Sequence, residues 1–148
     1  MRRVMSILLA AAGLGACAGR GHPTPTAATA AGSPTGTLAQ VYYWRAKPGK
    51  LDEYSRYIRE VAEPIDREAQ RRGAFVSVTT LVAHDTTSAW THMRIFVLRD
   101  SAQLRALSAA LDSATIRLEP DSARRRVRGE YSATLRDRVG AVLAEVLH

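Results

Sequence analysis

The sequence has almost no cysteine: Cys17 is the only one among 148 residues. A domain with one cysteine cannot form an internal disulfide, so its own core must hold it together. The four histidines do not stand at metal-ligand spacings, and we expect neither a metal nor a cofactor. A glycine-rich phosphate loop is also lacking, because the glycines from Gly13 to Gly21 fall in the N-terminal segment described next.

Long apolar runs are lacking too. Val4 to Ala12 is uncharged, but a helix that crosses a bilayer needs roughly 20 apolar residues. The run follows the positive start Met1-Arg2-Arg3 and precedes small residues, which is typical of a secretory signal peptide. The stretch Leu14-Gly15-Ala16-Cys17 resembles the lipobox of bacterial lipoproteins.

This resemblance implies that residues 1–16 are a signal peptide cut between Ala16 and Cys17, and that acylated Cys17 begins the mature chain. Each buried methylene of an acyl chain contributes about 0.8 kcal/mol, so several chains on Cys17 would hold the protein at a lipid membrane. Ala18 is not acidic, which favours the outer membrane and a periplasm-facing domain. The alternative is an ordinary signal peptide that happens to contain a cysteine.

Residues 17–37 have no large apolar side chain and are rich in Gly, Pro, Ser and Thr, which indicates a flexible linker. Removing residues 1–16 takes away two arginines and lowers the formal charge from +7 to +5. Because the chain is expected to be exported, we do not read this charge as a nucleic-acid interface. The dense run Arg124 to Arg128 indicates an exposed helical turn or, alternatively, a contact to anionic head groups.

Residues 38–148 alternate strand and helix patterns. Apolar spacing predicts a helix from Leu51 that is interrupted at Pro64 and ends at Gly73. Asp100 or Ser101 caps a second helix. Helical spacing continues after Pro120 with Leu135, Val139, Val142 and Val146; residues 139–147 also fit a strand, but helix is favoured. Aromatic and β-branched residues predict strands at 38–46, 75–84 and 90–98.

This order resembles the dimeric α/β-barrel superfamily, whose members include NIPSNAP-like and EthD proteins and the antibiotic-biosynthesis monooxygenases. The stretches that carry the resemblance are Val41-Tyr42-Tyr43-Trp44, Pro48-Gly49-Lys50-Leu51-Asp52-Glu53-Tyr54 and the strand from Trp90 to Leu98. It implies an α+β fold: a ferredoxin-like dimeric α/β barrel with an antiparallel sheet, here with an extra C-terminal helical segment. It also implies a homodimer.

Alternation along residues 90–98 separates two faces. The face with Thr91, Met93, Ile95 and Val97 is expected to pack against helices. The other face mixes aromatic and cationic groups, which suits a pocket wall or, alternatively, a dimer interface. It carries Trp90, His92, Arg94 and Phe96, and Tyr42 and Trp44 of the first strand are expected to join it.

Three functions follow from this pattern. The first is a membrane-anchored homodimer that binds a small molecule, aromatic or acidic, or serves as an accessory module. The second is a cofactor-independent monooxygenase or isomerase in the same cavity, with His92 as a candidate general base. The third is a surface-binding module that acts through the arginine-rich segment. Whether the chain is an enzyme stays open, because no catalytic set can be placed residue by residue.

Overall fold

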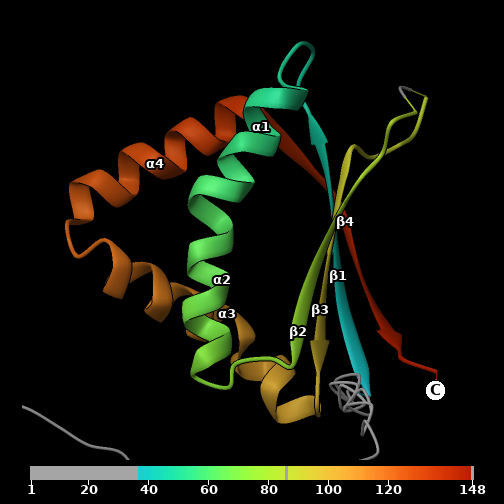
Figure 1. Cartoon of the computed structure of the whole chain (residues 1–148), viewed down its shortest axis with the longest axis vertical. Helices are drawn as coiled ribbons and strands as arrows, with labels where there is room; N and C mark the ends of the chain where they lie inside the picture. Colours follow the sequence, from blue (N-terminus) through green and yellow to red (C-terminus); the bar gives the residue numbers. More distant parts are fainter. Residues whose placement is uncertain (1–36, 86, 148) are drawn as a thin grey trace, which may run out of the picture. The chain divides into compact units, whose positions relative to one another are not determined.

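The computed structural model describes residues 37–85 and 87–147. The predicted signal peptide, Cys17 and all of the predicted linker except Thr37 therefore lie outside the described residues. The described chain is an α+β fold, as predicted, with helices on one side of a four-stranded antiparallel sheet (Figure 1). The strands are β1 (Leu38–Ala46), β2 (Ser77–Val82), β3 (His92–Leu98) and β4 (Arg136–Glu145), in the spatial order β2-β3-β1-β4.

The first helical segment is continuous but not uniform. It consists of α1 (Leu51–Tyr57), the π-helical turn η1 (Ile58–Ala62) and α2 (Glu63–Arg71). The N–H of Glu63 reaches back to the carbonyl of Ile58, five residues earlier. The next residue, Pro64, has no N–H to donate, so the helix is weakened at the predicted break. The segment ends at Gly73, whose φ of 80° lies in the left-handed region.

The remaining helices follow β3. Asp100 caps α3 (Ser101–Leu118) by accepting hydrogen bonds from the N–H groups of Ala102 and Gln103, at 2.8 and 2.9 Å. After a short connection, α4 (Ser122–Leu135) begins, and the side chain of Asp121 caps it in the same way. Helix α4 is the extra C-terminal helical segment. Among the described residues, no helix is both long and apolar enough to cross a membrane.

The helix favoured for residues 139–147 is wrong, because these residues belong mostly to β4. Strand β4 pairs with β1 along its whole length, from Leu38 opposite Glu145 to Ala46 opposite Arg136. The spacing of the valines fits both structures, and pairing decides between them: β1 would otherwise leave one row of backbone groups without partners.

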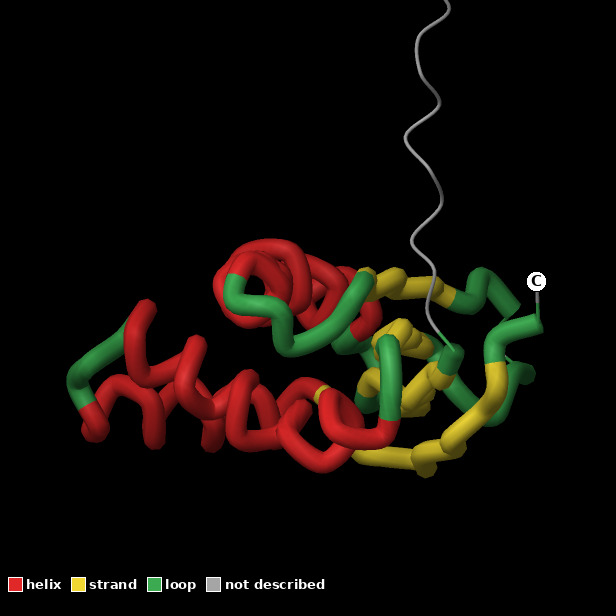
Figure 2. The backbone as a smooth tube through the Cα atoms, turned by 90° about the horizontal axis from the view of Figure 1, so that it is seen from below, coloured by secondary structure: helices red, strands yellow, loops and turns green. Residues whose placement is uncertain are grey.

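Helices α2 and α3 cover one face of the sheet, which we call the inner face; the other face is the open face (Figures 1 and 2). The main core lies between the inner face, α2 and α3. Its buried members are Ala69, Phe75, Phe96, Leu98, Leu107 and Ala114. A second cluster joins the ends of β1 and α4 to α1 through Ala46, Tyr54, Ile58 and Leu135.

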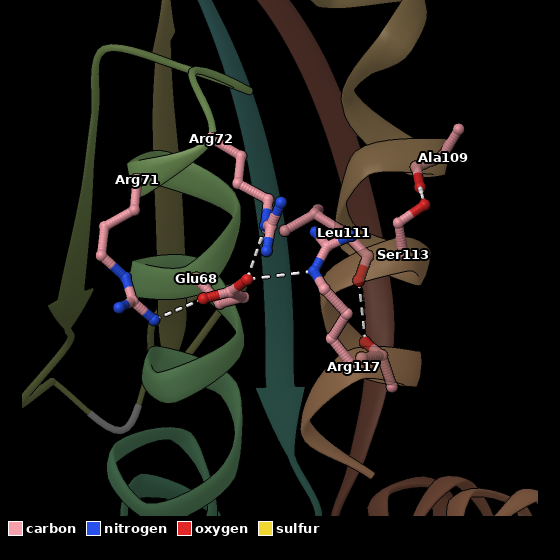
Figure 3. A network of polar contacts seen from close by, with 8 residues as sticks. Glu68, Arg71, Arg72, Ala109, Leu111, Ser113 and Arg117 are labelled. Atoms are coloured by element: carbon pink, nitrogen blue, oxygen red, sulfur yellow. Dashed lines mark hydrogen bonds and ion pairs between the residues drawn. The ribbon is translucent and has the colours of Figure 1, made fainter. Parts of the chain in front are cut away.

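An ionic network fastens α2 to α3. The buried carboxylate of Glu68 accepts hydrogen bonds from Arg72 Nε at 2.7 Å and from Arg117 Nε at 3.0 Å, and it also pairs with Arg71 (Figure 3). The Arg72 hydrogen bond is the largest of several contacts that lower the pKa of Glu68. Because Arg117 belongs to α3, the carboxylate connects two helices that are distant in sequence.

Candidate functional site

The register of the sheet corrects the predicted faces of β3. His92, Arg94 and Phe96 stand opposite Trp44, Tyr42 and Gln40 of β1, on the inner face. Phe96 is 2 % exposed and packs in the core beneath the helices. The face predicted to pack against helices carries Met93, Ile95 and Val97, and it is the open face. Both faces are rich in apolar residues, so alternation separated them without indicating which one the helices cover.

Trp90 does not join the predicted set. Strand β3 begins at His92, and alternation orders side chains only within an extended strand. The Trp90 ring lies 6.2 Å from the ring of Tyr43, a residue of the open face. The structure therefore brings together Tyr42, Trp44, His92, Arg94 and Phe96 on the inner face and places Trp90 elsewhere.

His92 is completely buried and both of its ring nitrogens have partners. The Ser55 hydroxyl donates to the carbonyl of Leu51 at 2.8 Å, so at 3.0 Å it accepts a hydrogen bond from Nε2–H of His92. The Thr91 hydroxyl accepts from the Ala46 N–H at 2.7 Å, and it donates its one proton to Nδ1 at 2.9 Å because the Trp44 carbonyl, at 3.4 Å, is the more distant acceptor. This network assigns the neutral Nε2–H tautomer. His92 therefore has no free lone pair with which to act as a general base in this arrangement.

Burial lowers the pKa of His92 from its ordinary value of 6.5 to about 4. Between these values the unfolded chain binds a proton that the folded chain does not. We therefore expect the free energy of unfolding to fall as pH drops from 6.5 to 4, by up to about 3 kcal/mol from this residue. Urea unfolding at pH 7.5, about one unit above this pH range, and at pH 4.5, just inside it, measures this loss.

The control is a comparison of His92→Gln with His84→Gln, since His84 is exposed. The His92→Gln variant should lose less stability on acidification than the parent, whereas His84→Gln should follow the parent. Equal acid sensitivity of all three proteins would show that His92 is not buried in its neutral form.

Arg94 lies beside His92 on the inner face and pairs with Asp66 of α2. Asp66 is 3 % exposed, and burial lowers the pKa of Arg94. Arg94 Nε is buried without a hydrogen-bond partner among the described residues. Asp66 is not among the predicted site residues, although the sequence contains a signal for it: Asp66 lies within the buried stripe of its helix, eight residues after Ile58 and three before Ala69.

A small cavity of about 150 Å³ adjoins His92 between η1 and the edge strand β2. Its wall includes Ser55, Glu63 and Thr80, and Glu63 and Thr80 also line a neighbouring cavity of about 280 Å³ that reaches Asp66. A larger groove of about 680 Å³ separates α1 and η1 from α4 and includes Tyr57, Val127 and Tyr131. No three metal-ligating side chains gather anywhere in residues 37–85 and 87–147.

The arginine-rich run lies in the first half of α4. Arg124 and Arg126 point to solvent, with side chains 74 % exposed. Arg125 and Arg128 instead turn back to the connection between α3 and α4. Arg125 donates to the carbonyls of Glu119 and Pro120, at 2.8 and 2.7 Å, and Arg128 lies 3.5 Å from the Glu119 carboxylate. Half of this run therefore has a structural role within the domain.

Two further arginines lie on the inner face where β4 begins. A bulge in β4 places Arg138 opposite Trp44 but Gly140 opposite Tyr43, which leaves Val139 as the extra residue. The Arg136 guanidinium stacks on the Trp44 ring, 3.5 Å from its centroid, and that of Arg138 lies 5.0 Å from the Tyr42 ring centroid. No sequence pattern indicated either arginine, because their position depends on β4 and on its bulge.

Together, the sheet order and the helices on one side define a small α+β protein of the ferredoxin-like type. No family model and no curated protein matches the sequence. Among solved structures, HapK from Hahella chejuensis is similar, with a TM-score of 0.52 and 12 % identity, over 74 % of this chain and 92 % of HapK. PA3566 from Pseudomonas aeruginosa has a TM-score of 0.45 and 15 % identity, over 79 % and 98 % of the two chains. The HapK similarity supports the fold alone.

Proposed function

We propose that this chain is an exported lipoprotein, anchored in the membrane through acylated Cys17, whose domain forms a homodimer and binds a small molecule. The single observation that supports the dimer most strongly is the apolar open face of the sheet. The proposal favours binding over catalysis, because both nitrogens of His92 are occupied and Arg94 is neutralised by Asp66.

The open face carries apolar side chains from all four strands. At its centre, Ala39 and Val41 of β1 are already buried, at 6 % and 7 % exposed, and Met93, Ile95 and Val97 of β3 are half-buried. At its margins, Leu81 is 42 % and Val142 is 49 % exposed. The helices of residues 37–85 and 87–147 lie on the opposite side (Figure 2). The apolar members are Ala39, Val41, Tyr43, Leu81, Met93, Ile95, Val97, Val142 and Ala144.

A second copy of the chain is the simplest cover for this face, because a two-fold axis pairs the same surface with itself. Four strands of about seven residues form a surface of roughly 20 by 24 Å. The two footprints together cover at most about 1,000 Å², which lies at the lower limit for a specific interface. An apolar patch of this size on a soluble protein is often functional.

The test of the dimer uses two neighbouring residues of β4 that are equally exposed but lie on opposite faces: Val142 at 49 % and Leu143 at 51 %. Light scattering should report a dimer for the parent at micromolar concentration. Val142→Lys should give a monomer, because it places a charge in the interface, and Leu143→Lys should remain a dimer. A monomeric parent, or equal behaviour of both variants, would contradict the proposed interface.

The anchor has its own test in cells. Cys17→Ser should release the protein from the membrane fraction or leave it unprocessed, because the serine cannot take the acyl chains. Cys17→Ala has the same expected outcome and excludes an effect of the hydroxyl. Unchanged membrane retention and unchanged processing in both variants would rule out the lipoprotein hypothesis without affecting the dimer.

A further inference from the structure

The two arginines on the inner face, Arg136 and Arg138, have no counter-charge among the described residues. Neither Arg136 nor Arg138 has an ion pair or a side-chain hydrogen bond within residues 37–85 and 87–147, and Arg136 Nε is buried without a partner. Asp137 stands between them in sequence, but it pairs in register with Arg45 on the opposite side of the strand. A half-buried guanidinium without a counter-charge is costly.

Aromatic rings hold both arginines in place. Arg136 stacks on Trp44 and also lies 5.6 Å from the centroid of the buried Tyr54 ring. The Arg138 guanidinium lies 5.0 Å from the Tyr42 ring centroid and 5.8 Å from the Trp44 ring centroid. Stacking fixes the guanidinium planes and leaves their edges, which carry the N–H donors, for another group.

The same strip of the inner face continues with apolar side chains along β4. Ala141 stands opposite Tyr42, and Leu143 stands opposite Gln40. Both are exposed, and Leu143 retains 51 % of its surface. In the described part of the chain, α4, which leads directly into β4, packs on this strand; no other helix packs on it extensively. Cationic donors and an apolar strip therefore lie side by side on one surface.

We propose that Arg136 and Arg138 bind the carboxylate of a small organic acid whose apolar body lies along Tyr42, Ala141 and Leu143. This inference deepens the proposed small-molecule function, on which it depends, and names its ligand class. Arginine suits a carboxylate because its N–H donors match the two oxygens. The bulge at Val139 is what turns both arginines to the inner face while Val142 stays on the open face.

The test titrates the purified full chain with 2-naphthoate and with 2-naphthamide, a neutral compound of the same shape. Calorimetry measures affinity, and the indole N–H resonance of Trp44 reports the location. The carboxylate should bind about tenfold more tightly than the amide, as expected for charge-assisted hydrogen bonds. Arg138→Gln should remove this preference, and Arg138→Lys should restore part of it. Arg138 is exposed, so these variants should fold.

The matched control is Arg126→Gln, an exposed arginine of α4, which should leave both affinities unchanged. Equal affinities for carboxylate and amide, or no binding of either at about 10 mM, would overturn the proposal. A carboxylate preference that survives Arg138→Gln would also overturn this site, while the broader small-molecule function would stand. Light scattering on the same samples keeps a failure of the dimer distinguishable from a failure of this site.

Discussion

Asp66→Asn is expected to lower the free energy of unfolding by about 3–5 kcal/mol, because it removes the counter-charge of a buried guanidinium. Arg94 keeps only 13 % of its side-chain surface, and Asp66 keeps 4 %. No other described acid forms an ion pair with Arg94, so the charge left behind would be buried and unpaired. Urea unfolding at one protein concentration measures the loss.

Two comparisons distinguish this effect from a general loss of an ion pair. The surface pair of Arg126 and Glu130 is 3.8 Å apart with both side chains more than two-thirds exposed, so Glu130→Gln should cost less than about 1 kcal/mol. The double variant Asp66→Leu with Arg94→Met should recover much of the stability lost in Asp66→Asn, because it leaves no charge behind. A cost for Asp66→Asn as small as that for Glu130→Gln would contradict the buried pair.

Phe96→Ala is expected to cost about 3–5 kcal/mol through the cavity it leaves in the core. The Phe96 ring makes edge-to-face contacts with Phe75 at 5.1 Å and with Tyr42 at 5.9 Å. These residues belong to one protomer, so the loss should not depend on protein concentration. Urea unfolding across a range of concentrations checks both the size and the constancy of the effect.

Ile95→Ala is the matched control, because Ile95 is the preceding residue on the opposite face. If the open face is the dimer interface, the stability lost in Ile95→Ala should change with protein concentration, since it acts through association. A larger, concentration-independent loss for Ile95→Ala than for Phe96→Ala would mean that the helices cover the other face.

Short-range features of the sequence set the bounds of several helices and strands in this domain. The aromatic and β-branched residues from Leu38 to Ala46 predict β1 with the bounds that the structure shows. Pro64 marks the break in the first helix, and Asp100 marks the start of α3. Each of these features depends on residues within one or two turns: a missing N–H, a capping oxygen, or a β-rich run.

The candidate site depended on contacts between distant residues, and sequence reasoning recovered only part of it. Tyr42, Trp44, His92, Arg94 and Phe96 do share one face, as alternation predicts. Their partners Ser55 and Asp66 come from a helix, and no local pattern connects them to β3. The position of Arg136 and Arg138 required both the strand β4 and its bulge.

The sequence by itself therefore determined the first strand, the presence of β2 and β3, and the starts and breaks of the helices, because short-range sterics and hydrogen bonding set them. Tertiary structure alone decided which face of the sheet the helices cover, since both faces offer apolar side chains and packing chooses between them. It also decided that residues 136–145 form a strand: their valines suit a helix as well, and only the backbone partners that β1 offers resolve the choice.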